Sequence, residues 1–379
     1  MLKILVLEPY YGGSHRAFIE GWSVHSRHKF VVLNLPAYHW KWRMRHAAVT
    51  FSERLRCEPS HECDAIFCSD MLNLAEFRGL VGQPWVSLPA IVYFHENQFT
   101  YPVREEHERD LHFAMTNVTT ALAADQVWFN SEFHRRDFLT HARELLGRMP
   151  DFQPLPGIDA IERKSFIHPP GIEAFPQRGV RRSGPMRIVW AARWEHDKAP
   201  EEFFAALAQL RARGVDFRVS VLGESFADVP DAFGHARRTL ADHIDHWGFL
   251  ASRAQYRAAL TDADVFVSTA RHEFFGIAAV EAIAAGAFPL LPARLAYPEL
   301  LPAEDAAESP FFYGQDADQL AIRLADAARR LERDELWPGE CQRALRQAAR
   351  FHLSQVADTM DAALENTVGQ ANVASSTSV

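Results

Sequence analysis

Residues 265–300 read VFVSTARHEFFGIAAVEAIAAGAFPLLPARLAYPEL, and this stretch decides the fold class. It begins with an apolar run typical of a buried strand, passes through a polar loop, and continues as a helical pattern from Gly276. A second apolar run follows at Phe288. A strand, a loop, a helix and another strand in this order form the repeating unit of a parallel sheet, so the stretch predicts a doubly wound α/β fold.

The same alternation of short apolar runs with amphipathic helical patterns extends along nearly the whole chain. Mostly apolar runs are expected of parallel strands that are covered by helices on both faces. The predicted strands are Lys3–Leu7, Phe30–Leu35, Ala65–Cys68, Ile91–Phe94, Gln126–Phe129, Ser165–Ile167, Arg187–Trp190, Phe217–Leu222, Ile244–Trp247, Val265–Ser268 and Phe288–Leu291.

The alternation breaks once, at the segment PPGIEAFPQRGVRRSGP of residues 169–185, which has no periodicity and is typical of a linker. We therefore expect two Rossmann-like domains, at residues 1–170 and 186–345, joined by a linker at 171–185. A helix at 346–368 could cross back to the first domain. The tail GQANVASSTSV, residues 369–379, is predicted to be disordered.

The composition excludes several classes of protein. A formal net charge of −9 over 379 residues argues against a protein that coats nucleic acid indiscriminately. The N-terminal apolar run, Ile4–Leu7, is shorter than a signal peptide or a membrane-spanning helix requires, and no later run is long enough. We therefore expect a cytoplasmic protein without a membrane partner; the oligomeric state is left open.

The cysteines do not predict a disulfide framework or a metal site. There are four of them in the whole chain. Cys57, His61, Cys63 and Cys68 lie close together in the sequence, but their spacing lacks the paired Cys-x-x-Cys pattern of a zinc site. No metal is expected.

Two carboxylates near the helix start at Gly276 suit the binding of hydroxyl groups. Glu273 lies in the loop before this helix and Glu281 lies one to two turns inside it. The helix N-terminus offers free N–H groups, and a carboxylate can accept hydrogen bonds from two vicinal hydroxyls, as a hexose or a ribose presents them. Eight helical positions span about 12 Å, too far for the ~5–9.5 Å of a glycosidase pair. Solvated helix charges are the alternative.

A second polar loop follows the predicted strand Arg187–Trp190. The segment ARWEHDKAPEEFF, residues 192–204, carries Arg193 and Lys198 ahead of a helix. Two cations at a strand end could clamp a diphosphate and stabilise the charge that builds on it as it leaves. A surface ion pair with Glu195 or Asp197 is the alternative.

The two loops together resemble the E-x7-E signature of retaining GT-B glycosyltransferases of family four: EFFGIAAVE spans residues 273–281, and Arg193 and Lys198 form the upstream R-x4-K. The resemblance implies that Glu273 contacts the donor sugar, Glu281 the ribose, and Arg193 and Lys198 the diphosphate. It implies no divalent metal, and two domains that face across a cleft. The remaining residues expected at the donor are Gly12, Gly13, Gly223, Trp247, Phe274, Phe275, Gly276 and Ile277.

Several sequence segments in the N-terminal half indicate a narrower family. EPYYGGSH at residues 8–15, HWKWRMR at 39–45, YFHENQFTYPV at 93–103 and WFNSEF at 128–133 look like the tRNA-queuosine α-mannosyltransferase family. The likeness extends to about Pro302. That family transfers mannose from GDP-mannose to the cyclopentene-diol of queuosine in a tRNA anticodon loop, with retention. The resemblance implies GDP-mannose as donor substrate, no cofactor, and queuosine-containing tRNA as partner.

Two other functions remain open. The chain could be a retaining glycosyltransferase that acts on a lipid, glycan or small molecule, or a non-catalytic RNA-binding protein gated by a sugar nucleotide. Transfer of label from GDP-mannose to queuosine-containing tRNA, and release of GDP, discriminate these alternatives.

The first domain is expected to bind the acceptor. Gly12 and Gly13 open a helix, where the backbone can approach sugar and phosphate closely or simply form a turn. His95 could orient or deprotonate an acceptor hydroxyl, or be a structural histidine. Arg27–Arg56 contains seven Lys or Arg against one Glu, with tryptophans that could stack on unpaired bases or belong to the core. The residues expected at the acceptor are Ser14, His15, Trp40, Trp42, Arg43, Arg45, Glu96, Asn97 and Gln98.

Overall fold

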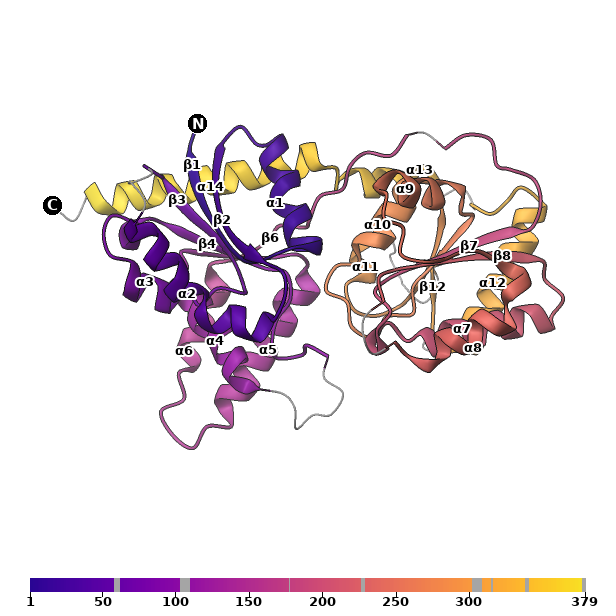
Figure 1. Ribbon diagram of the computed structural model, residues 1–379, viewed down its shortest axis with the longest axis horizontal. Helices are drawn as coiled ribbons and strands as arrows, with labels where there is room; N and C mark the ends of the chain where they lie inside the picture. Colours follow the sequence, from indigo (N-terminus) through magenta and orange to yellow (C-terminus); the bar gives the residue numbers. More distant parts are fainter. Residues whose placement is uncertain are drawn as a thin grey trace. The chain divides into compact units, whose positions relative to one another are not determined.

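The computed structural model describes residues 1–57, 62–102, 110–176, 178–225, 229–301, 309–314, 316–337 and 341–376, without the side chains of 341–343 and 374–376. The chain divides into two compact units, Met1–Gly171 with Leu353–Val379, and Ile172–His352. Each unit contains one six-stranded sheet in which the strands pair in parallel, with helices around it (Figure 1). This architecture confirms the predicted α/β class.

The first sheet has the strand order β2-β1-β3-β4-β5-β6. Strand β1, between β2 and β3, is apolar at residues 4–7 because both of its faces are covered there: Ile4 and Val6 pack on one side, and Leu5 and Leu7 on the other. Every strand predicted for this unit is present. Their bounds are β1 Lys3–Tyr11, β2 Lys29–Pro36, β3 Ala65–Ser69, β4 Ala90–Phe94, β5 Gln126–Phe129 and β6 Ser165–Ile167.

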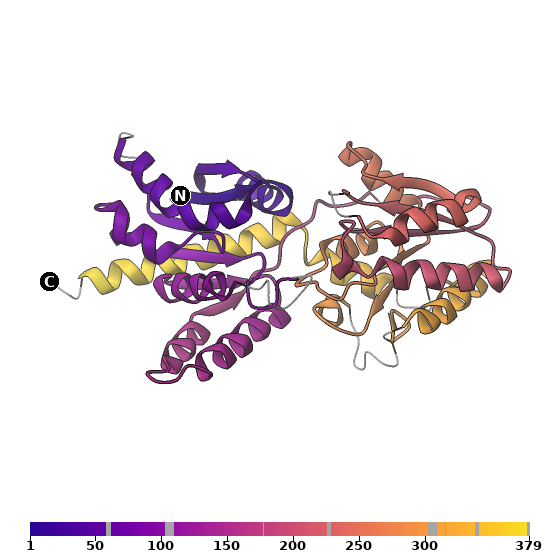
Figure 2. The ribbon, with the colours of Figure 1, turned by 60° about the horizontal axis from the view of Figure 1, so that its bottom comes forward.

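Two helices cover the first face of this sheet, α1 (Gly13–His25) and α14 (Leu353–Ser376), which lie side by side in Figures 1 and 2. The fully buried carboxylate of Asp361 in α14 accepts hydrogen bonds from the indole of Trp22 at 2.8 Å and the hydroxyl of Ser26 at 2.7 Å. The last helix therefore belongs to the first unit. The opposite face packs against α2 Trp40–Cys57, α3 Leu74–Val81, α4 Leu111–Ala123, α5 Glu132–Gly147 and α6 Leu155–Arg163.

The second sheet has the order β12-β11-β10-β7-β8-β9. Its edge strand β12 was not predicted, since two residues are too few to show a hydrophobic pattern. The strands are β7 Met186–Ala191, β8 Phe217–Leu222, β9 Ile244–Gly248, β10 Val265–Val267, β11 Phe288–Pro292 and β12 Phe312–Tyr313. The helices are α7 Pro200–Ala212, α8 Asp231–Thr239, α9 Arg253–Asp262, α10 Ile277–Ala284, α11 Tyr297–Leu300, α12 Ala317–Glu332 and α13 Cys341–Ala349.

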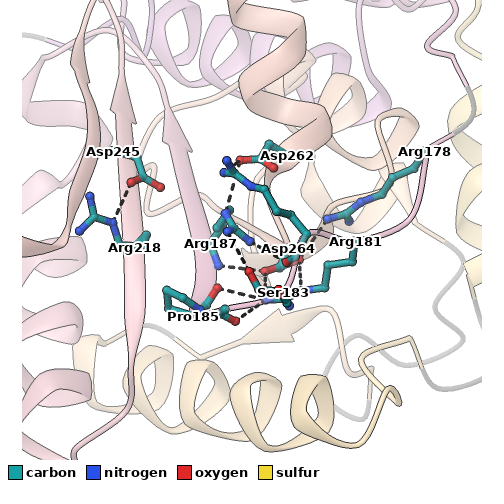
Figure 3. Close-up of polar contacts among 11 residues, drawn as sticks. Arg178, Arg181, Ser183, Pro185, Arg187, Arg218, Asp245, Asp262 and Asp264 are labelled. Atoms are coloured by element: carbon teal, nitrogen blue, oxygen red, sulfur yellow. Dashed lines mark hydrogen bonds and ion pairs between the residues drawn. The ribbon is translucent and has the colours of Figure 1, made fainter.

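The arginines of the predicted linker are bound to the second unit (Figure 3). Arg178 donates to Asp264 at 3.1 Å, and Arg181 donates to both oxygens of the same carboxylate at 2.8 and 2.9 Å. Arg182 pairs with Asp262 at 2.6 Å. Arg178 and Arg181 therefore fasten the linker to the residue just before β10, whereas 65% of the Arg182 side chain stays exposed.

The C-terminal segment also differs from expectation. The helix predicted at 346–368 is two helices, α13 and α14, and α14 continues to Ser376. The predicted disorder from Gly369 is therefore wrong up to Ser376, because no proline interrupts the helix that is anchored by its packed first half. Residues 377–379 lie outside the described range. Among the described helices, none combines the length and apolarity needed to cross a bilayer.

Candidate functional site

Two loops of the second unit, far apart in sequence, meet at the carboxyl ends of β7 and β10. Lys198 ends a 3-10 turn (His196–Lys198) after β7, and Glu273 lies in the loop after β10. The Lys198 ammonium donates to the carbonyl oxygen of His272 at 2.6 Å and lies 3.5 Å from Glu273 Oε2. Because strands of a parallel sheet end at one edge, the predicted proximity of these loops follows from the fold.

The environment of Lys198 fixes its charge. Its side chain is mostly buried, and Asp197 Oδ2 lies 3.1 Å from the ammonium. Burial lowers the pKa of Lys198, but the carboxylates of Glu273 and Asp197 outweigh it and raise the pKa above its ordinary value. Lys198 is thus a permanent cation at the edge of the sheet.

Arg193 lies earlier in the same loop and is more accessible. Its guanidinium lies 3.3 Å from Glu195, and about half of the side chain (47%) is exposed. The ion pair considered as the alternative for this residue is therefore present. Its charge is also close enough to Lys198 to oppose the rise of that residue's pKa. Because a guanidinium has five N–H donors, this contact with Glu195 leaves donors of Arg193 for an anion.

The start of α10 requires a glycine, because of its backbone conformation and its close packing. Its N-cap, Gly276, has φ 90° and ψ 51°, a left-handed conformation that favours glycine, and a Cβ there would lie 2.8 Å from Tyr297. Phe274 and Phe275 are buried, so the side chains of these expected donor residues contribute packing, whereas Ile277 is 36% exposed. The first N–H groups of α10 have no partner within the helix itself, as at any helix N-terminus.

Glu281 has a partner that the sequence analysis missed. The hydroxyl of Tyr256, in α9, donates to Glu281 Oε2 at 2.9 Å. Burial raises the pKa of Glu281, and the hydrogen bond from Tyr256 and the charges of Arg253 and Arg257 oppose that rise. The sequence RAQYRAALTD of α9 carries no ligand-binding pattern, so only the fold could reveal the contact.

Gly223 and Trp247 lie at the ends of neighbouring strands, β8 and β9. A Cβ on Gly223 would lie 1.8 Å from the carbonyl oxygen of Ala192, so only glycine fits there. Trp247 stacks on Phe204 with ring centroids 5.8 Å apart and meets Trp194 edge-on at 5.5 Å. The three aromatic rings thus pack together beside the ends of β8 and β9.

In the first unit, the predicted glycine turn is present and is followed by a buried histidine. Gly12 caps α1, and Ser14 is exposed in its first turn. His15 is 6% exposed, and its Nδ1 lies 3.3 Å from the buried carboxylate of Glu8. Burial alone lowers the pKa of His15, but Glu8 raises it to about 9. A direct acceptor contact by this ring is thus disfavoured by its burial.

His95 follows β4 directly and stacks on His15, with ring centroids 3.9 Å apart. Ligand atoms of Glu8, His15 and His95 lie within 4.8 Å of one another, which makes them the metal-binding candidates among the described residues. In stacked rings, however, the in-plane lone pairs run side by side and do not converge on one ion. We therefore assign no metal to this trio.

The other residues expected at the acceptor divide by burial. Asn97 is fully buried and bonds Asp137 and the backbone N–H of Phe99, so it holds its own loop. Gln98 is also buried, but its Nε2 has no hydrogen-bond partner among the described residues. Glu96, half-buried, adds to the negative field around His15.

Some aromatic and basic side chains of α2 pack against the protein interior, and others are exposed on its surface. Trp40 packs against Phe113 at 5.3 Å, in agreement with the core alternative, and Arg43 is buried with its Nε donating to the carbonyl of Pro36 at 3.0 Å. Trp42 is 61% exposed, and Arg45 is exposed with Asp110 at 3.5 Å. Of these four residues, only Trp42 and Arg45 therefore have exposed side chains.

The cysteines show no metal-binding cluster within the described part of the chain. Cys57 is exposed, Cys63 is partly buried and Cys68 is buried, all as free thiols. Burial raises the pKa of the Cys68 thiol well above its usual range, which keeps it protonated and inert. His61, part of the sequence cluster, lies outside the described residues.

Two known protein families match this chain, one over each unit. The family described as tRNA-queuosine alpha-mannosyltransferase N-terminal matches residues 3–172, and the family described as glycosyl transferases group 1 matches residues 172–350. The tRNA-queuosine alpha-mannosyltransferase of Drosophila melanogaster is 38% identical over 317 residues, which cover 80% of this chain and 82% of that protein.

More distant relatives share the fold or one part of the sequence. A GDP-mannose:cellobiosyl-diphosphopolyprenol alpha-mannosyltransferase of Xanthomonas oryzae is 29% identical over 185 residues, 48% of this chain and 47% of that protein. Sucrose-phosphate synthase of Thermosynechococcus elongatus superposes with a TM-score of 0.71 at 15% identity, covering 98% of this chain and all of that one. A glycosyltransferase of Rickettsia africae gives 0.64 at 13% identity, covering 97% and 98%. The fold is GT-B.

Proposed function

The chain belongs to the tRNA-queuosine alpha-mannosyltransferase family, and on this premise we propose that it transfers mannose from GDP-mannose to queuosine in a tRNA, with retention of the anomeric configuration. It is a hexosyltransferase, so it binds a nucleotide sugar and an acceptor. The observation that carries the proposal is the meeting of Lys198 and Glu273, a cation for the leaving diphosphate and a carboxylate for the sugar, 3.5 Å apart.

In this proposal Lys198 and Arg193 bind the diphosphate of the donor, Glu273 binds the sugar hydroxyls and Glu281 the ribose. The bond from the anomeric carbon to the β-phosphate oxygen breaks as the acceptor oxygen attacks the same face, and the leaving phosphate accepts the acceptor's proton. Negative charge grows on the diphosphate during this step, so the two cations bind it more tightly in the transition state than in the ground state.

The remaining donor contacts are assigned by position. We propose that the N–H groups at the start of α10, beside Gly276, bind the sugar and phosphate, and that the turns at Gly223 and Trp247 hold the nucleobase. A donor contact of Gly12 and Gly13 stays a prediction. The reaction as proposed uses neither a cofactor nor a metal ion. It takes place in the cytoplasm, where a tRNA acceptor would be found.

Tyr256→Phe tests the assignment of Glu281 to the donor. The substitution keeps the ring but removes the hydroxyl that holds Glu281 Oε2 at 2.9 Å. Loss of this one hydrogen bond is expected to raise the KM for the donor by about 5–10-fold while kcat stays within about twofold. Steady-state kinetics with varied donor measure this; an increase confined to the KM for the tRNA would contradict the assignment.

The acceptor surface is proposed to be the exposed side of α2 together with His95 and Gln98. Lys41 and Arg45 supply positive charge there, and Trp42 supplies a flat apolar face. An anticodon loop already presents unstacked bases, so cations for its phosphates and an aromatic face for a base are the groups that its recognition requires.

Trp42→Ala is expected to raise the KM for the tRNA about tenfold, because base–aromatic stacking contributes ~1–3 kcal/mol per base. The expected effect on the KM for the donor is negligible. Val49→Ala is the matched control, since Val49 is also exposed (39%) on α2 but offers no stacking face. Equal effects of the two substitutions on tRNA binding would remove Trp42 from the interface.

The function itself is tested with purified protein, labelled GDP-mannose and two tRNA preparations that differ only in queuosine. We expect label in the queuosine-containing tRNA alone, together with release of one GDP per mannose transferred. Transfer to a lipid or small molecule but to neither tRNA would support the alternative glycosyltransferase. Binding of both ligands without release of GDP would support a non-catalytic RNA-binding protein.

A further inference from the structure

We infer that His15 is a positioning residue for His95: its ring, paired with Glu8, forms the surface on which the His95 ring is stacked. The inference rests on the proposed contact between His95 and the acceptor. It replaces the direct acceptor contact expected of His15, whose side chain is buried beneath His95.

The ring of His15 is held in position by Glu8, a residue of β1. Glu8 is 1% exposed, and its Oε1 accepts hydrogen bonds from the backbone N–H of Tyr10 at 2.8 Å and from the hydroxyl of Ser69 at 3.0 Å. Its other oxygen lies 3.3 Å from His15 Nδ1. A buried carboxylate held in this way needs a cationic partner, and His15 is the cation beside it.

The ring of His95 is held equally firmly. Its backbone N–H donates to Asp70 Oδ1 at 2.9 Å, and its carbonyl accepts from Asn130 Nδ2 at 3.0 Å. Phe18 and Tyr93 contact the ring edge-on at 5.4 and 4.7 Å. The face against His15 is closed by stacking, so the ring is fixed in the plane that this contact sets.

The charged groups around the two rings favour protonation of His15 and oppose protonation of His95. The carboxyl groups of Glu8, Asp70 and Glu96 surround His15. Burial raises the pKa of Asp70 to about 8, so Glu8 is the main carboxylate partner of His15. Burial, then the charges of His15 and His134, hold the pKa of His95 well below its ordinary value. The pair thus consists of one protonated and one neutral imidazole.

The chemical consequence concerns the direction of hydrogen bonding. A neutral imidazole offers one nitrogen that can accept a hydrogen bond or a proton, whereas an imidazolium can only donate. The neutral form can accept a hydrogen bond from the non-reacting hydroxyl of a diol acceptor, which leaves the proton of the attacking hydroxyl to the departing phosphate. The charge on His15 therefore preserves the useful form of His95 as the pH falls.

His15→Phe tests this, because phenylalanine keeps a flat ring against His95 but carries no charge. We expect the acid limb of the kcat/KM profile to move to higher pH, because the charge of His15 no longer adds to burial in lowering the pKa of His95. The loss of transfer relative to wild type would then be larger at acid than at alkaline pH. The imidazole ¹⁵N shifts of His95, identified by their loss in His95→Gln, should report the same rise in its protonation midpoint.

A purely structural role would instead lower turnover evenly across the pH range and leave the ¹⁵N midpoint of His95 unchanged, and that result would overturn the inference. If His15→Phe does not fold, Glu8→Gln provides the same test: the ring stays, its proton is no longer held, and a smaller shift in the same direction is expected. Wild-type turnover in His95→Gln would refute the proposed acceptor contact independently of the coupling between the two rings.

Discussion

Lys198→Ala is expected to lower kcat/KM for sugar transfer by about 10²–10³-fold, the usual cost of removing one group that stabilises charge in the transition state. The ammonium of Lys198 separates two carboxylates, Asp197 at 3.1 Å and Glu273 at 3.5 Å. Without it, these carboxylates would repel the leaving diphosphate in place of helping to neutralise it. The loss should appear in kcat as well as in the donor KM.

The controls separate chemistry from folding. Arg213→Ala removes an exposed cation at the end of α7 and should leave transfer unchanged. Glu273→Gln keeps the shape of the side chain but weakens its hold on Lys198 and on sugar hydroxyls, so it should lose activity to a similar extent with the fold intact. A folded Lys198→Ala protein with near-wild-type turnover would contradict the assignment of Lys198 to the diphosphate.

Asp264→Asn is expected to lower the melting temperature of the second unit by roughly 6–12 °C, equivalent to about 3 kcal/mol. Asp264 is 1% exposed and accepts hydrogen bonds from Arg178, Arg181 and the backbone N–H of Arg187 (Figure 3). The substitution leaves two partly buried guanidinium groups without a counter-ion. Circular dichroism melting curves measure the shift.

Asp262→Asn is the matched control for this prediction. Asp262 pairs with Arg182 at 2.6 Å and lies 3.4 Å from Arg187, but 44% of its side chain is exposed. Exposed pairs contribute at most about 1 kcal/mol, so the melting temperature should change little. Equal shifts for the two variants would show that Asp264 does not fasten the linker.

The strands and the donor loops could be predicted because they depend on short-range patterns. A strand covered on both faces has a continuous apolar run, as residues 4–7 of β1 do, and this pattern is visible in the sequence. Parallel strands end at one edge of their sheet, so loops after β7 and β10 had to lie close together. The contact of Lys198 with Glu273 follows from these two facts.

The features that were missed depend on partners brought together by the tertiary fold. Tyr256 faces Glu281 only because α9 packs beside α10, and the arginines of the linker find Asp264 only because the linker crosses the start of β10. The stacking of His15 on His95 joins α1 to the end of β4. No fixed spacing in the sequence predicts these contacts, since the residues of each pair lie on different elements.

The central claim is that the 193–198 loop and the 273–281 turn bind one ligand. Hydrogen exchange measured by mass spectrometry, with and without GDP-mannose, tests it directly, since a bound ligand slows amide exchange in the backbone it contacts. We predict slower exchange in both stretches together, at concentrations that saturate transfer. Protection of only one stretch, or of neither, with the sugar nucleotide bound would contradict the account.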